Sequence, residues 1–242
     1  MTRIITALFL AVAACFSCSA QEVKDSTKLA SHDNLHSTHY LLMPNGFGLK
    51  RGEAYYQNAL VMLNQFGIGV TDKISVSMGT IPIYFFGADV IPFWVAPKIS
   101  LPLGPKVSLG GGVMYMFTYY GGDGDDVIGG WDTGGLAFGS LTVGSRDRNT
   151  SIGFGYGITG DRLAQQPLLT ISHMRRMGRR GYLLTENFIF LSSNNTFGIV
   201  SLGGRIIISR LGLDFGMAAP VGLNGFVAIP WLGFTVPLGK PH

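Results

Sequence analysis

After residue 36, the chain alternates between apolar positions and small or polar positions with a period of two. The clearest segment is 107–120, where one face carries Val107, Leu109, Val113, Tyr115 and Phe117 and the other carries Ser108, Gly110, Gly112 and Thr118. Successive side chains of a β-strand point to opposite faces, so this pattern predicts strands that are apolar on one side. Twelve segments have the character of strands, at about 37–44, 53–70, 74–81, 91–101, 107–120, 131–144, 150–159, 167–175, 182–191, 196–208, 211–219 and 226–238, and the first of them is included because it makes the strand number even.

The connections between these segments alternate between short and long. Short, mostly charged connections lie at 71–73, 104–105, 146–149, 178–181 and 209–210, and longer ones lie at 82–90, 121–130, 160–166, 192–195 and 220–225. Outer-membrane barrels have short periplasmic turns and longer outer loops, and an even number of strands places both chain ends on the periplasmic side. Aromatic residues beside the longer loops predict an interfacial girdle of Tyr55, Tyr56, residues 84–86, Tyr119, Tyr120, Trp131, Phe197 and Phe226.

Composition narrows the fold class. Charged residues make up 13% of the chain, about half the ~25% of a soluble domain, while hydrophobic residues make up 47% and glycine contributes 35 of 242 residues. No run of ~18 apolar residues follows residue 20, so the sequence predicts no spanning helix. We therefore expect an all-β protein that forms a single transmembrane antiparallel up-and-down β-barrel of about twelve strands, with ten or fourteen also compatible. A secreted soluble β-sandwich is the alternative fold, although it would cover its outer faces with charge.

The first twenty residues have the organisation of a secretory signal peptide. A short positive region and an apolar stretch that ends at Phe16 precede small residues and a cleavage point before Gln21. We assign 1–20 to the signal peptide, 21–36 to a polar periplasmic tail and 37–242 to the transmembrane barrel. Both cysteines, Cys15 and Cys18, fall in the signal peptide, so we expect no disulfide or thiol chemistry in the mature chain. Acylation of Cys15 at a lipoprotein processing site is the alternative fate of this region.

Three stretches carry a resemblance to a known class of membrane protein. They are Tyr55-Tyr56-Gln57-Asn58, the hairpin Gly67-Ile68-Gly69-Val70-Thr71-Asp72-Lys73 and the final strand Trp231-Leu232-Gly233-Phe234-Thr235-Val236-Pro237-Leu238. With the signal peptide, they resemble the small outer-membrane β-barrel proteins of Gram-negative bacteria that carry no assigned function. The resemblance implies a location in the cell outer membrane, contact with outer-membrane lipids and a transient partnership with the barrel insertion machinery. The net charge of +4 is too small to indicate a nucleic-acid partner.

Three motifs have the letters of a binding site, but each has a simpler structural explanation. Residues 155–160 fit a dinucleotide fingerprint, yet they lie in an alternating strand instead of before a helix. Residues 121–129 fit one calcium-binding nonapeptide, a motif that works in stacked copies, and are better explained as an acidic outer loop. His32, His36 and His39 have helical spacing for metal binding, but they lie in a polar tail beside a strand. We therefore predict neither a cofactor nor a metal site.

The sequence favours a function without catalysis: a narrow polar lumen that serves passive transport, small-ligand binding or a structural role. The alternative is a membrane-embedded lipid hydrolase that uses His173 and would need a serine and a carboxylate from other strands. Neighbouring Ser172 does not qualify, because adjacent side chains of a strand point to opposite faces. A basic cluster of Arg175, Arg176, Arg179 and Arg180 surrounds a tight turn and predicts contacts with lipid phosphates.

The hairpin 196–219 gives the sharpest expectation. Keeping its apolar residues on the lipid side predicts a lumen lined by Ser201, Arg205, Gly212 and Asp214. Residues opposite each other in a hairpin share a face, so a two-residue loop at 209–210 pairs Arg205 directly with Asp214. Turning the strand over would expose Arg205 to lipid, at about 2–4 kcal/mol near the bilayer midplane. We therefore predict that the two charges form an ion pair inside the barrel.

The alternating pattern predicts a protein that is integrated in the membrane and heat-modifiable. A closed barrel resists unfolding in detergent, so an unboiled sample is expected to migrate differently from a boiled one on a detergent gel. Quantitative release from membranes by high-salt buffer without detergent would contradict this prediction.

Overall fold

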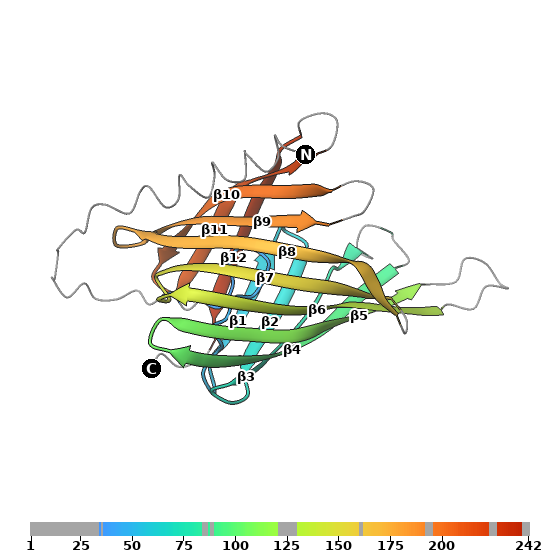
Figure 1. The fold of residues 1–242 in the computed structure, drawn as a ribbon, viewed down its shortest axis with the longest axis horizontal. Coiled ribbons are helices and arrows are strands. Elements are labelled where there is room, and N and C mark those ends of the chain that lie inside the picture. The colour runs from blue at the N-terminus through green and yellow to red at the C-terminus, as the bar shows by residue number, and fades with distance from the viewer. Residues whose placement is uncertain are drawn as a thin grey trace.

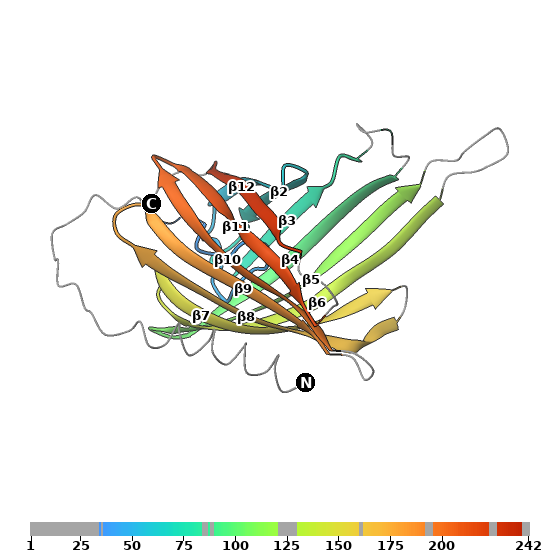
Figure 2. The ribbon, with the colours of Figure 1, turned by 90° about the horizontal axis from the view of Figure 1, so that it is seen from above.

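The computed structural model describes residue 34, residues 36–83, residue 87 and residues 90–120, 130–159, 162–191, 196–222 and 227–238. They form a closed barrel in which each strand pairs antiparallel with its neighbours along the chain, and the first strand closes on the last (Figures 1 and 2). The strands are β1 (Ala54–Ala59), β2 (Leu63–Gly69), β3 (Ile74–Thr80), β4 (Val90–Gly104), β5 (Val107–Tyr120), β6 (Gly130–Gly144), β7 (Arg148–Thr159), β8 (Arg162–Met177), β9 (Gly181–Phe190), β10 (Phe197–Ile208), β11 (Leu211–Val221) and β12 (Ile229–Pro237). No helix among these residues is long and apolar enough to cross a bilayer.

The exterior of the barrel is apolar, as the alternation predicts. Leu109, Ile152 and Phe154 point outward with 40%, 56% and 61% of their surface exposed, whereas the alternating Ser108 and Ser151 are buried inside. A soluble protein would not expose this much apolar surface, but a bilayer accommodates it. The expected fold class is confirmed, and the β-sandwich alternative is wrong because one sheet closes on itself.

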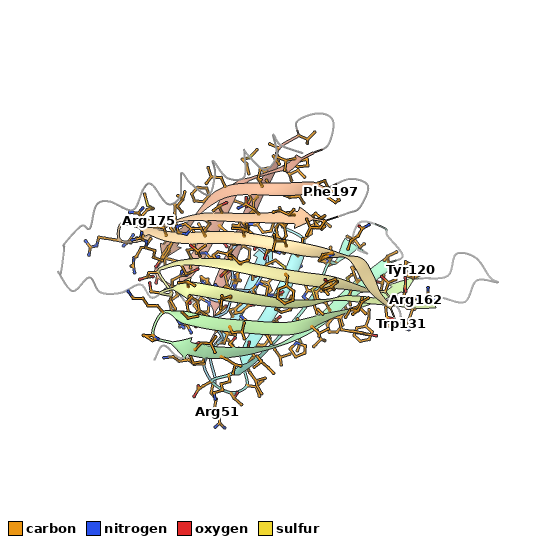
Figure 3. The ribbon with its side chains drawn as sticks, viewed as in Figure 1. Arg51, Tyr120, Trp131, Arg162, Arg175 and Phe197 are labelled. Carbon is orange, nitrogen blue, oxygen red and sulfur yellow. The ribbon has the colours of Figure 1, made fainter. Side chains whose placement is uncertain are left out.

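The two ends of the barrel differ in their connections. At one end, called here the turn end, β8 and β9 are joined at 178–180 and β10 and β11 at 209–210. The opposite end, called the loop end, carries the longer connections that follow β5 and β11. Figure 3 shows Arg175 at the turn end and Tyr120, Trp131 and Arg162 at the loop end.

Two strand predictions are wrong, and their effects on the strand count cancel. The predicted segment 37–44 is not a wall strand, and the only β-contact described for it is an isolated bridge between His39 and Pro44. The predicted segment 53–70 is two strands, β1 and β2, separated by a tight turn at 60–62. In that turn Leu60 and Val61 have φ angles of 52° and 66°, a left-handed conformation usually taken by Gly, Asn or Asp. Because no such residue marks this turn, the strand pattern runs through it unbroken.

The hairpin of β10 and β11 has the predicted register. Ile208 pairs with Leu211 across a two-residue loop, and Arg205 pairs directly with Asp214. Ser209 adopts the positive φ of 56° that a tight hairpin loop of this kind requires. The even loop length keeps the apolar faces of both strands on the outside.

Residues 36–50, called here the plug, lie inside the barrel at its turn end (Figure 2). His36, Ser37, Tyr40, Leu41 and Asn45 are each no more than 2% exposed. Few hydrogen bonds join the plug backbone to itself, and one of them runs from Asn45 N to Thr38 O at 3.0 Å. Side chains of the wall bind several of its other polar groups, as Thr142 does for Gly46 N. The predicted signal peptide and all of the predicted tail except Asn34 and His36 lie outside the described residues.

The predicted aromatic girdle is partly present. Tyr120 and Trp131 are 43% and 68% exposed at the loop end, where Figure 3 also shows Phe197. The prediction for Tyr55 is wrong: its side chain points into the lumen, is 6% exposed and accepts a hydrogen bond from Gln65. Residues 84–86 and Phe226 lie outside the described residues.

The fit of the plug can be tested at Gly46, where a Cβ atom would overlap the carbonyl oxygen of Ser108 on β5. We expect Gly46→Val to displace the plug and to raise amide hydrogen exchange at residues 38–46, while the wall strands stay protected. Gly104→Val is the matched control, since a Cβ at Gly104 meets nothing within 4 Å. Unchanged protection of the plug in Gly46→Val would contradict this account.

Candidate functional site

The Arg205–Asp214 pair lies in the lumen at the level of the plug. Arg205 Nε lies 2.6 Å from Asp214 Oδ1, and Nη2 donates to Oδ2 at 2.9 Å, which makes the contact bidentate. The guanidinium also donates to the carbonyl oxygens of His36 and Tyr40 at 2.8 and 2.7 Å. A buried charge pair is tolerated only when its remaining donors and acceptors are satisfied. The plug carbonyls supply the acceptors that the wall lacks.

Glu186 on β9 binds the next part of the plug. Its carboxylate accepts hydrogen bonds from the backbone N–H groups of Leu42 and Met43 at 2.9 and 2.8 Å, and the residue is 1% exposed. These charge-assisted bonds hold a turn whose own backbone donors would otherwise be unsatisfied. Glu186 was not among the residues singled out from the sequence, although an acid at an inward strand position is a recognisable signal.

Polar side chains also replace part of the backbone ladder between β9 and β10. The paired register breaks between Ile199–Phe188 and Gly203–Leu184, although the residue offset is the same on both sides. In the break, Glu186 N donates to Ser201 Oγ at 3.0 Å, and Ser201 Oγ donates to Glu186 O at 2.6 Å. Thr185 Oγ1 donates to Ser201 O, and Ser201 N donates to Asn187 Oδ1. We call this stretch of the wall the Ser201 seam.

Several other wall residues contact the plug. Tyr40 Oη bonds Asn149 Oδ1 at 2.6 Å and Ser151 Oγ at 2.7 Å, and Arg146 donates to Ser37 Oγ and Gly48 O. Gly212, predicted to line the lumen, leaves space for the His36 ring, which a Cβ atom would overlap. The structure thus places Ser201, Arg205, Gly212 and Asp214 on the inner face, each buried and each directed to the plug or to the seam.

Above the plug, towards the loop end, the lumen contains a cavity of about 460 Å³. Its walls are mostly apolar, with contributions from Leu63, Trp94, Met114, Met116, Leu136, Phe138, Leu168, Phe188, Phe190 and Ile199, and the plug residues Leu42 and Met43 form part of its floor. This volume lies within the range of ~300–1,000 Å³ typical of small-molecule sites.

The expectation of a narrow polar lumen is therefore correct only at the turn end. In the other half of the barrel, both faces of several strands are apolar. On β5 the inward positions change from Ser108, Gly110 and Gly112 to Met114 and Met116. This change along one face was the signal available in the sequence. Period-two alternation alone does not reveal this change, because the pattern is recognised by the apolar residues of the outer face.

A short chain of polar groups crosses one side of the cavity. Trp94 Nε1 donates to Gln65 Oε1 at 3.3 Å, and Gln65 Nε2 donates to Tyr55 Oη at 2.8 Å. Thr38, His39 and Lys98 also line the cavity beside the plug. The site is thus an apolar chamber with a few polar groups near its floor.

The structure does not favour the hydrolase hypothesis. His173 lies on the face of β8 opposite to the buried Ser172, and its Nδ1 lies 2.9 Å from Thr150 Oγ1 on β7. Within the described part of the chain, neither a serine hydroxyl nor a carboxylate is hydrogen-bonded to His173. The arrangement that would support acyl chemistry is not assembled around this ring.

The remaining motifs can be placed in part. His36 and His39 lie in the plug with ring centroids 6.4 Å apart, whereas His32 lies outside the described residues. No group of three or more His, Cys, Asp or Glu side chains among the described residues could hold a metal ion. Gly155 and Gly157 are inward positions of β7, and residues 121–129 and Gly160 are outside the described ranges.

Comparison with known proteins identifies a fold but no family. No protein-family model and no curated protein matches the sequence. Among solved structures, the KdgM porin is similar to this chain with a TM-score of 0.54 and 7% identity, over 78% of this chain and 99% of that chain. The CymD monoaromatic hydrocarbon channel gives a TM-score of 0.42 and 10% identity, over 78% of this chain and 76% of that chain. At 7% identity the likeness to the KdgM porin shows the barrel fold alone.

Removing the charge of Arg205 is expected to destabilise both the wall and the plug. Arg205→Met leaves Asp214 charged and buried, so the free energy of unfolding should fall by about 3–5 kcal/mol in denaturant titrations of the refolded protein. Arg205→Met/Asp214→Asn should recover part of this loss because the uncompensated charge is gone. Arg176→Gln is the control: it removes a pair with Asp147 that is 24% and 44% exposed and hydrogen bonds at the turn, so it should cost clearly less than Arg205→Met. Equal effects of Arg205→Met and Arg176→Gln would refute the assignment.

Proposed function

We propose that this protein is an outer-membrane channel that binds small, mostly apolar molecules in the cavity above its plug and mediates their passive passage. The observation that carries the proposal is the apolar cavity itself, because an inward-facing apolar surface has no role in holding the barrel in lipid. Ordinary small-molecule sites combine such a surface with a few polar groups, as found here near the floor. The fold shared with the KdgM porin is compatible with this function.

The outer membrane is the proposed location. The apolar exterior suits a bilayer, and outer-membrane proteins cross it as closed barrels with short turns at one end and longer loops at the other. We further propose that outer-membrane lipids cover this exterior and that the barrel insertion machinery assists assembly. We propose that the basic residues of the turn end, among them Arg175 (Figure 3), contact lipid phosphates.

The plug makes a simple water-filled pore a poor description. Its side chains and those of the wall fill the turn end, with Tyr40, Met174 and Leu184 each no more than 1% exposed. Ions would have to cross a region where the polar groups are already bound to one another. The proposed cargo is therefore a molecule whose apolar surface is removed from water when it enters the apolar cavity.

The cavity can be filled to test this function. Ala96 lines the cavity on β4, and we expect Ala96→Phe to weaken the binding of nitrobenzene by about tenfold or more, because overpacking costs typically 1–3 kcal/mol. Binding is measured by quenching of Trp94 fluorescence in nanodiscs, in a Trp131→Phe/Trp231→Phe background that leaves one tryptophan at the cavity.

Ala137→Phe is the matched control, because Ala137 pairs with the outward-facing Val113 and Tyr156 on the lipid side of β6. It should leave nitrobenzene binding unchanged. The proposed function fails if the parent protein shows no saturable quenching beyond that of lipid alone, or if both phenylalanine variants behave alike.

A further inference from the structure

The charged side chains at the level of the plug are not all paired with one another. Arg205 is neutralised by Asp214, and Glu186 is satisfied by plug N–H groups. Two further basic residues face the plug, Lys98 from β4 and Arg146 from the turn after β6. No carboxylate among the described residues forms an ion pair with either of them. Arg146 is only half-buried, whereas Lys98 is buried, so Lys98 is the buried basic side chain without a carboxylate partner among the described residues.

Lys98 is the basic group in contact with the cavity. Its side chain points inward from β4, is 7% exposed and donates a hydrogen bond to the carbonyl oxygen of Phe47. It also lines the apolar cavity beside the plug. An ammonium group has three donors, and a single neutral carbonyl is weak compensation for removing it from water.

His39 adds a second polar group beside the same cavity. The residue is 3% exposed, its Nδ1 lies 3.4 Å from Thr38 Oγ1, and its Nε2 has no hydrogen-bond partner. Buried polar atoms are nearly always paired in folded proteins, so this unpaired nitrogen is available to a ligand atom. Nε2 itself has almost no accessible surface, so a ligand atom reaches it when the His39 ring turns toward the cavity. His39 and Lys98 both border the cavity where it meets the plug.

We propose that the cavity binds amphiphiles with one carboxylate and an apolar body, and that Lys98 and His39 recognise the carboxylate. This inference rests on the proposed function, since it specifies which molecules the cavity selects. The carboxylate supplies the missing negative charge to Lys98 and an acceptor to His39, while the apolar body packs against Trp94, Met116 and Phe138. Such charge-assisted contacts, made away from water, give a carboxylate an advantage over an alcohol of the same length.

The test compares decanoate with decanol, a ligand of equal chain length that lacks the charge. Binding to the full chain in nanodiscs is measured by calorimetry against empty nanodiscs, and the carboxyl resonance of ¹³C-labelled decanoate reports its environment. We expect decanoate to bind at least tenfold more tightly than decanol. Lys98→Met should reduce decanoate binding to the level of decanol without changing decanol binding, which also shows that the cavity is intact.

Lys106→Met is the control, because Lys106 lies in the turn between β4 and β5 and outside the cavity. It should change neither affinity, whereas His39→Phe should weaken decanoate binding alone. Equal affinities for the two ligands, or a decanoate affinity unaffected by Lys98→Met, would overturn this inference and leave the proposed function standing. If neither decanoate nor decanol nor nitrobenzene binds, the proposed function itself is overturned.

Discussion

The hydrogen bonds of Arg205 connect the wall of this barrel with the segment inside it. A guanidinium has five donors and cannot shed its charge, so burying it requires acceptors on several sides. Asp214 provides a bidentate contact on the neighbouring strand, and the carbonyls of His36 and Tyr40 provide the rest. The dependence is mutual, because the plug has little secondary structure of its own and relies on wall side chains for its polar groups. Wall and plug therefore satisfy part of each other's buried polar groups.

This mutual dependence explains why the lumen divides into two halves. Wherever the plug backbone faces the wall, the wall must offer hydrogen-bonding side chains or the empty space of a glycine, as Thr142 and Gly212 do. Beyond the plug, the described residues place no further chain segment inside the barrel whose backbone groups the wall would have to satisfy. The inward positions there are free to be apolar, and they form a cavity instead of a packed core. The apolar cavity thus lies directly above the polar region formed by the plug and the wall around it.

The Ser201 seam ties the wall, the plug and the cavity together. Glu186 contributes its backbone to the seam and its carboxylate to the plug turn at Leu42 and Met43, two residues that line the cavity. Phe188 and Ile199, the pair next to the seam on the loop side, also line the cavity. The plug turn therefore contacts the Ser201 seam, where side chains join β9 to β10 in place of the regular backbone ladder.

The sequence by itself determined the features that depend on near neighbours in the chain. Alternation established the apolar exterior, and the two-residue loop established the register that brings Arg205 to Asp214. Only the tertiary structure decided whether a strand-like segment joins the wall. Segment 37–44 was expected as a strand because an even strand number requires it, yet it lies in the lumen. The turn at Leu60 and Val61 carries no turn residue. The sequence shows that some inward positions are apolar, but an inward Met116 or Phe138 becomes a binding surface only when the closed ring leaves space in front of it. Closure involves contacts between residues far apart in the chain, and alternation along a single strand does not contain them.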